Sequence, residues 1–279
     1  MLICGIILII KGTFAIFLQA VEIMILTVDI GNSNIVFGGF EGEELVFVAR
    51  MATDISRTED EYAGQILSTL SLHNVGREKV SGAIISSVVP PLNSVIKTAI
   101  EIIYGVTPLT VGPGIKTGIN IHCDNPASVG ADIITACVAA HHIYGSPSLI
   151  VDMGTATKMM VVNDKGAFIG VSIIPGVLMG LNALATGTAQ LPRVGLEAPP
   201  LVVAKNTVDC IRSGVVYGNA SLVDGMIDRI YEEVGCELPV YATGGLAKTI
   251  VKYCRHDIVT DEYLLLKGLN IIYNKNKTE

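Results

Sequence analysis

Two short acidic turns combine the residue types that hold a phosphate group and its metal ion. One is Asp29-Ile30-Gly31, which ends an apolar segment, and the other is Asp152-Met153-Gly154, which Thr155 follows. Glycine lets the backbone approach a ligand, while amide hydrogens and small polar side chains bind phosphate oxygens. A carboxylate at the end of a strand can also hold Mg²⁺, directly or through water. We therefore interpret both segments as phosphate-facing turns.

Both turns occur in the same pattern of predicted strands. An apolar strand precedes each turn, and two strands joined by a glycine-containing turn follow it, which indicates a hairpin. The following strands are 35–40 and 45–50 in the first copy, and 159–162 and 167–174 in the second. One Asp-x-Gly is a weak signal because these residues begin many turns. Two copies in matching contexts indicate a duplicated domain with a shared cleft, the alternative being coincidental turns.

The elements around these turns are predicted to alternate between helices and strands, as in an α/β fold. Thr58 and Glu61 form a capping-box pattern that opens a helix. Asp132 falls in the first turn of another helix, where the macrodipole favours a carboxylate, so helix stabilisation explains it as well as function does. The glycine-rich segment 112–130 is long enough to suggest a functional loop. The predicted helices cover 58–72, 92–104, 131–144, 177–184, 206–234 and 263–273, the further strands 80–89, 108–111 and 239–242, and a loop of small residues 185–192.

Composition excludes several classes of function. Half of the 279 residues are hydrophobic, enough for one large or two smaller domains. The net charge is −7, no Lys/Arg cluster stands out and Trp is absent, so nucleic acid is not expected as a partner. The six cysteines lack CxxC or zinc-site spacing, which is typical of reduced thiols in a cytosolic protein. We expect His141 and His142 to end a helix rather than to bind metal.

Residues 1–23 form an apolar leader that differs from the rest of the chain. Lys11 and Glu22 interrupt it, so a membrane span is not expected. It also lacks the basic start and cleavage site of a secretory signal. Met24 directly precedes the first strand, so we expect translation to start there, the competing interpretation being a membrane-associating leader. We divide the remainder into subdomains 24–145 and 146–279.

Taken in order, the motifs resemble those of type III pantothenate kinases, in the superfamily of actin, sugar kinases and heat-shock ATPases. The resemblance runs from Met24 to about Asn270, and several ordered motifs are more specific than any one. It implies an α/β fold of two duplicated actin-like (ribonuclease H-like) subdomains, with mixed five-stranded sheets and a nucleotide cleft between them. The motifs are the two acidic turns, Val88-Val89-Pro90-Pro91, Gly130-Ala131-Asp132, Thr188-Ala189-Gln190-Leu191-Pro192 and Thr243-Gly244-Gly245.

The resemblance also implies an activity. A cytoplasmic homodimer would use ATP to phosphorylate pantothenate to 4'-phosphopantothenate, the first step of coenzyme A biosynthesis. Magnesium and a monovalent cation, potassium or ammonium, would be required. Asp132 would be the catalytic base, Asp29 would lie near magnesium and Asp152 would bind the monovalent cation. The implied substrate-binding residues are Cys123, Gly130, Ala131, Asp132, Ile133 and Thr188, and the implied ATP-binding residues are Asp29, Ile30, Gly31, Asn32, Ser33, Asn34, Ile35, Val36, Thr155, Thr243, Gly244 and Gly245.

Three positions depart from the family pattern. Ile133 stands where arginine is usual, Cys123 lies near a usual tyrosine, and Lys158 replaces a usual threonine. Isoleucine cannot bind an anionic group, whereas Lys158 could supply a compensating cation. An active pantothenate kinase is favoured because the three aspartates are present. The alternatives are a divergent paralogue that phosphorylates another small alcohol, and a non-catalytic nucleotide-binding regulatory protein.

Overall fold

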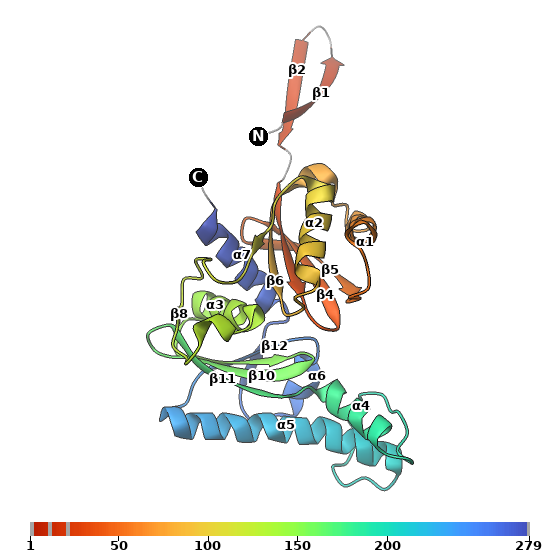
Figure 1. Ribbon diagram of the computed structural model, residues 1–279, viewed down its shortest axis with the longest axis vertical. Coiled ribbons are helices and arrows are strands. Elements are labelled where there is room, and N and C mark those ends of the chain that lie inside the picture. Colours follow the sequence, from red (N-terminus) through yellow and green to blue (C-terminus); the bar gives the residue numbers. More distant parts are fainter. Residues whose placement is uncertain (1–2, 11–12, 21–22, 278–279) are drawn as a thin grey trace. The chain divides into compact units, whose positions relative to one another are not determined.

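The computed structural model describes residues 3–10, 13–20 and 23–277 of the chain (Figure 1). They form two compact units that divide between Val111 and Gly112. This boundary precedes the expected one between residues 145 and 146, because α3 (Ala131–Tyr144) packs on the sheet of the second unit.

The apolar leader contains two strands. β1 (Ile3–Ile10) pairs antiparallel with β2 (Thr13–Ala20), from Ile3 opposite Ala20 to Ile10 opposite Thr13. Lys11 and Glu22 lie outside the described residues, and a translation start at Met24 stays a prediction. Among the residues that the structure describes, no helix has the length and apolar character needed to cross a membrane.

The first unit contains a mixed five-stranded sheet with two helices on one face. The strand order is β5-β4-β3-β6-β7, and β3 at the centre is antiparallel to β4 and parallel to β6. Alternate β3 residues from Met24 to Ile30 join α1 and α2 in one core. Because side chains alternate along a strand, Asp29 lies on the other face. The bounds are β3 (Met24–Ile30), β4 (Asn34–Glu41), β5 (Glu44–Ala52), α1 (Glu59–Ser71), η1 (Arg77–Lys79), β6 (Val80–Ser87), α2 (Leu92–Tyr104) and β7 (Leu109–Thr110).

The predicted capping box at the start of α1 is confirmed. The Glu61 backbone N–H donates to Thr58 Oγ1 at 3.4 Å, and the Thr58 backbone N–H donates to Glu61 Oε2 at 2.8 Å. These two bonds satisfy donors that the first helical turn leaves without intrahelical acceptors. The order of three strands, helix, strand, helix and strand is also as predicted.

The second unit has three layers. Its sheet runs β13-β12-β9-β10-β11-β8, with α4, α5 and α6 packed on one face and α3 and α7 on the other (Figure 1). A Cβ at Gly268 of α7 would lie 2.3 Å from Thr135 O of α3, so glycine permits the two helices to touch. The bounds are β8 (Asn120–Ile121), η2 (Pro126–Ser128), β9 (Ser148–Met153), β10 (Ala156–Val162), β11 (Ala167–Pro175), α4 (Val177–Gly187), α5 (Thr207–Val234), β12 (Val240–Thr243), α6 (Ala247–Ile250), η3 (Val251–Tyr253), β13 (Ile258–Thr260) and α7 (Leu264–Asn276).

The two sheets share one topology. In the first sheet, β3, β4 and β5 form an antiparallel meander. On the other side of β3, β6 pairs parallel with β3, and β7 pairs parallel with β6. In the second sheet, β9, β10 and β11 form the meander. On the other side of β9, β12 pairs parallel with β9, and β13 pairs parallel with β12. The short strand β8 extends the second sheet beyond the five expected strands. The predicted duplicated α/β fold is confirmed.

Candidate active site

The first acidic turn is closed by hydrogen bonds of its own backbone and of Thr53. The Gly31 N–H donates to Asn34 O at 3.0 Å. Thr53, which follows β5, donates its hydroxyl to Gly31 O at 2.6 Å and its N–H to Ser33 O at 3.1 Å. The side chains of Asn32, Ser33 and Asn34 are exposed. The turn is thus held by its own backbone and by Thr53, while its polar residues lie exposed at the surface.

The second acidic turn is closed in the same way. The Gly154 N–H donates to Ala156 O at 3.1 Å, and the N–H of Gly176, which follows β11, donates to Thr155 O at 3.2 Å. A Cβ at Gly176 would lie 2.2 Å from Thr155 O, so only glycine permits this approach. Thr155 is exposed. In both repeats, the residue that follows the third strand forms hydrogen bonds to the turn that follows the first strand.

Strand alternation places Asp152 and Lys158 on one face of the second sheet. Leu149, Val151 and Met153 of β9 pack in the core shared with α5, so Asp152 faces α3. On β10, Met160 packs in the core shared with α3, and Lys158 points to the same side. Asp152 and Lys158 are also direct partners in the β9–β10 register. Their side chains therefore meet beneath the N-terminus of α3.

Lys158 bridges two carboxylates there. Its Nζ lies 2.7 Å from Asp152 Oδ2 and also forms an ion pair with Asp132 Oδ2 in the first turn of α3. The side chains are 14 % exposed for Lys158, 12 % for Asp132 and 10 % for Asp152. We call Asp132, Asp152 and Lys158 the Lys158 cluster. It joins a helix and two strands that carry two of the sequence-predicted site residues.

The backbone around Asp132 fixes its carboxylate. The Ile133 N–H donates to Asp132 Oδ1 at 2.8 Å, while Oδ2 accepts from Lys158. A Cβ at Gly130 would lie 2.6 Å from Asp132 Oδ1, so the glycine leaves room for the carboxylate. A carboxylate with two oxygens has about four lone-pair positions, so each Asp132 oxygen keeps capacity for another hydrogen bond.

Burial and charge act in opposite directions within the Lys158 cluster. Burial alone lowers the pKa of Lys158, but the Asp152 carboxylate and then the Asp132 carboxylate raise it by more, so that it lies above the usual 10.5. Burial raises the pKa of Asp152, whereas the adjacent Lys158 ammonium favours its ionised form. The ammonium contacts both acids directly, so its charge opposes the effect of burial on Asp152.

The predicted ATP-binding segment Thr243-Gly244-Gly245 adjoins this cluster. Thr243 at the end of β12 is the register partner of Asp152 and is fully buried. Gly244 has φ +93°, and a Cβ there would lie 2.7 Å from Asp152 Oδ1. Gly245 is exposed. Glycine at position 244 thus allows this turn to approach Asp152, both through its left-handed backbone and through its lack of a side chain.

Of the six predicted substrate residues, five are not members of the Lys158 cluster, Asp132 being the exception. Ile133 is 6 % exposed and packs in the core between α3 and the sheet, and Cys123 packs against the same core. Thr188 is exposed after α4, where its Oγ1 donates to Leu184 O at 2.7 Å. Ala131 begins α3, and its carbonyl accepts from the Thr135 hydroxyl at 2.7 Å.

The residues of the first predicted phosphate loop divide between core and surface. Ile30 and Ile35 are fully buried in the core of the first unit. Val36 is half-buried and is the β4 register partner of Asp29. The structural repeat therefore pairs Asp29 with Val36 at the position where Asp152 is paired with Lys158.

The surroundings of Asp29 and of Asp152 differ in how well they suit the two cations that the resemblance implies, magnesium and a monovalent ion. Among the described residues, no group of three His, Cys, Asp or Glu side chains could hold a metal ion. Magnesium in phosphoryl transfer usually needs one or two carboxylates and the substrate phosphates, so Asp29 beside its exposed turn fits that ion. A monovalent metal ion does not fit at Asp152, because the Lys158 ammonium already contacts that carboxylate at 2.7 Å.

Comparison with known sequences gives consistent matches over most of the chain. A family model described as type III pantothenate kinase matches residues 25–229. A type III pantothenate kinase from Exiguobacterium sp. is 42% identical over 254 residues, covering 91% of this chain and 100% of the relative. Another from Halalkalibacterium halodurans is 43% identical over 253 residues, with the same coverages.

Solved structures share the fold. A Campylobacter jejuni protein assigned to the Baf family of transcriptional activators matches with a TM-score of 0.57 and 20% identity, over 90% of this chain and 98% of that chain. An inorganic polyphosphate/ATP-glucomannokinase from Arthrobacter sp. strain KM matches with a TM-score of 0.50 and 14% identity, over 91% of this chain and 100% of that chain.

Proposed function

The chain belongs to the type III pantothenate kinase family, and we propose that it phosphorylates pantothenate through a centre built on Asp132. The reaction transfers the γ-phosphoryl group of ATP to the primary hydroxyl of pantothenate, in coenzyme A biosynthesis. The observation that supports Asp132 as the base is its carboxylate geometry. One oxygen is held by the Ile133 N–H and the other by Lys158, in a setting where both side chains are largely buried.

Asp132 would act on the substrate hydroxyl. It orients the O–H group and accepts its proton as the hydroxyl oxygen forms a bond to the γ-phosphorus. The bond between that phosphorus and the bridging oxygen of ATP breaks, and ADP leaves with the bond's electron pair. The remaining lone pairs on the Asp132 oxygens provide the place for the proton.

The two acidic turns would bind the phosphates. Phosphoryl transfer depends on positioning and on neutralising charge, and the exposed residues Ser33 and Thr155 lie on turns that Thr53 and Gly176 close by hydrogen bonds. Asp29 would hold magnesium, which offsets charge on the β- and γ-phosphates when it is bound. Thr243, Gly244 and Gly245 would face the adenosine.

The experiment is product identification with the full chain, ATP and magnesium. Mass spectrometry should show phosphopantothenate in amounts that grow with enzyme concentration. A panel of other small primary alcohols, assayed in parallel, provides the comparison. If a different alcohol is turned over faster and pantothenate is used poorly, that alcohol and not pantothenate is the substrate. Absence of phosphoryl transfer to every alcohol, while ATP binding is retained in calorimetry, would instead support a regulatory protein.

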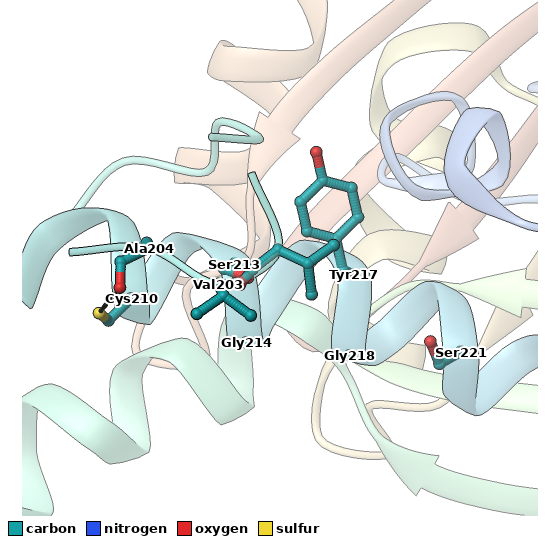
Figure 2. A pocket seen from close by; sticks show the side chains of 9 residues that line it. Val203, Ala204, Cys210, Ser213, Gly214, Tyr217, Gly218 and Ser221 are labelled. Carbon is teal, nitrogen blue, oxygen red and sulfur yellow. Dashed lines mark hydrogen bonds between the residues drawn. The ribbon is translucent and has the colours of Figure 1, made fainter. Parts of the chain in front are cut away.

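The expected homodimer has a candidate surface on α5. Residues 202–204 lie along this helix beside exposed small residues, and together they line a cavity of about 520 Å³ (Figure 2). Two hydrogen bonds hold this segment and the residues before it on α5: Ser213 Oγ donates to Val202 O at 2.5 Å, and Tyr217 Oη donates to Pro199 O at 2.7 Å. We call this the α5 surface; its lining residues are Val202, Val203, Ala204, Cys210, Ser213, Gly214, Tyr217, Gly218 and Ser221.

Two side chains of equal exposure allow a test of that surface. Val203 on the α5 surface and Leu72 at the end of α1 are each 82% exposed. An apolar exposed patch favours association, and a charge placed within it opposes association. In light scattering, Val203→Glu should give monomers where the wild type and Leu72→Glu give dimers. If Val203→Glu is still a dimer, the α5 surface is not the dimer interface. If the wild type is a monomer, the expected homodimer is wrong.

The free thiols support a cytoplasmic location. The five cysteines from Cys123 to Cys254 are unpaired in the structure. Reduced thiols are typical of the cytosol, where disulfides rarely persist. Fractionation of cells should place the protein with cytosolic markers, and its recovery with membranes would contradict this location.

A further inference from the structure

The Lys158 ammonium lies between the carboxylates of Asp132 and Asp152 and contacts both. We propose that Lys158 is a tethered cation that positions Asp132 and Asp152 for catalysis, so that this enzyme does not depend on a monovalent metal ion. The proposal rests on the proposed function, because the reaction supplies its main readout. Lys158 is a positioning residue in this account, since it acts through the two carboxylates.

The geometry gives Lys158 contacts that a bound cation would make. Its ammonium is 2.7 Å from Asp152 Oδ2 and in direct contact with Asp132 Oδ2. Lysine has three N–H donors, so one side chain can serve both carboxylates. The register of β9 and β10 sets Lys158 directly opposite Asp152, and the alternation of the strands turns both toward α3. The contact thus follows from the backbone arrangement of the hairpin.

Charge explains why a second cation is not required. Two carboxylates that are each nearly nine-tenths buried repel one another, and an ion between them offsets that repulsion. The Lys158 ammonium provides that positive charge covalently. A metal ion at Asp152 would have to lie beside this ammonium, where like charges repel strongly because solvent screening is weak.

The first test uses the wild-type full chain. Phosphopantothenate formation is measured with ATP and magnesium in potassium, sodium or tetramethylammonium chloride at equal ionic strength. The proposal predicts rates that agree within about twofold in the three salts. A rate in tetramethylammonium lower by about tenfold or more than in potassium would overturn the proposal and leave the kinase activity established. Absence of product in every salt would contradict the proposed function itself.

The second test restores the residue that is usual in the family, with Lys158→Thr. Removing the tethered charge should lower kcat by about tenfold or more in tetramethylammonium, with KM for ATP changed by less than about threefold. Potassium or ammonium should recover most of that loss. The matched control is Lys165→Thr, which removes an exposed lysine from the turn between β10 and β11 and should not alter cation dependence.

A binding measurement separates this role from a purely structural ion pair. A ligand that binds only the folded state raises the melting temperature. Potassium, compared with tetramethylammonium, should therefore raise the Tm of Lys158→Thr but not that of the wild type. A purely structural ion pair predicts a lower Tm for the variant without any recovery by potassium. That result, or potassium stabilisation of the wild type, would contradict the proposal.

Discussion

Lys158 Nζ lies 2.7 Å from Asp152 Oδ2, and these residues are direct partners across the hairpin of β9 and β10. The same ammonium contacts Asp132 at the start of α3. A single side chain therefore fixes the second acidic strand against the helix that carries the proposed base. This relationship leads to predictions about stability, pH dependence and catalysis.

Replacing Lys158 should destabilise the protein strongly. Lys158→Met leaves two largely buried carboxylates without their cation, and breaking a buried ion pair costs about 3–5 kcal/mol. The measurement is the free energy of unfolding from urea denaturation at neutral pH. Lys248→Met is the control, since it breaks the exposed pair with Glu262 and should have little effect. Equal, small effects of both variants would show that the Lys158 cluster does not contribute to stability.

The stabilising effect of Lys158 should also have a defined pH window. Burial lowers the pKa of Lys158, but Asp152 and Asp132 raise it further, so the folded-state pKa exceeds the usual 10.5. A group with a raised folded-state pKa contributes fully below its unfolded pKa and loses that contribution as pH rises through the folded one. On the alkaline side of neutral pH, the difference in unfolding free energy between wild type and Lys158→Met should therefore shrink only above about pH 10.5. A difference that disappears as the pH is raised from 7 to 9 would contradict this assignment.

Gly244 should be intolerant of a side chain. Its φ is +93°, and an added Cβ would lie 2.7 Å from both Asp152 Oδ1 and the Met153 carbonyl carbon. Gly244→Ala combines backbone strain with a close contact, so we expect a loss of about 3 kcal/mol or more in unfolding free energy. ATP affinity, measured by calorimetry, should fall as well, since the variant displaces the proposed adenosine segment.

Gly235 provides the matched control for that variant. It has a similar left-handed φ of +82° at the end of α5, but no atom lies within 4 Å of an added Cβ. Gly235→Ala should lower the free energy of unfolding only through backbone strain, by about 1–2 kcal/mol, and should leave ATP affinity unchanged. If both alanine variants lose the same stability and affinity, the close approach of Gly244 to Asp152 is not important.

The phenol of Tyr144 should ionise at an unusually high pH. Its hydroxyl donates to Asp261 Oδ2 at 2.9 Å, and burial followed by this hydrogen bond raises the pKa of Tyr144 to about 12. Tyr144→Phe should lower the free energy of unfolding by about 1 kcal/mol, because Asp261 keeps its other donors, Lys267 and the Tyr263 N–H. The ultraviolet titration difference between wild type and variant should show one phenol ionising near pH 12. A difference centred near pH 10 would show that the Asp261 contact is absent in solution.

Local sequence signals were sufficient to predict most of the fold. The capping box of Thr58 and Glu61 places the start of α1, and Pro90-Pro91 ends the strand before α2. Repeated Asp-x-Gly turns predict the duplication because each needs the same strand, turn and hairpin arrangement. The short strands β8 and β13 were not predicted, since two or three residues carry no readable periodicity and form only through parallel pairing with distant strands.

The Lys158 cluster could be predicted only in part. The pattern around Asp152 indicates the turn, and the resemblance assigns roles to Asp132 and Asp152. The bridge needs the register that places Lys158 opposite Asp152 and the packing of α3 over that strand pair, and both are tertiary properties. Similarly, the sequence shows that Ile133 replaces an arginine but not that its side chain packs in the core.

The most direct test of the account compares kcat for phosphopantothenate formation by wild type and Asp132→Asn, with Asp164→Asn, in an exposed turn of the same unit, as control. An amide keeps the shape of Asp132 but cannot accept the hydroxyl proton, so kcat should fall by about 10²–10⁴-fold while the control keeps wild-type turnover. Wild-type kcat in Asp132→Asn would contradict the claim that Asp132 is the catalytic base.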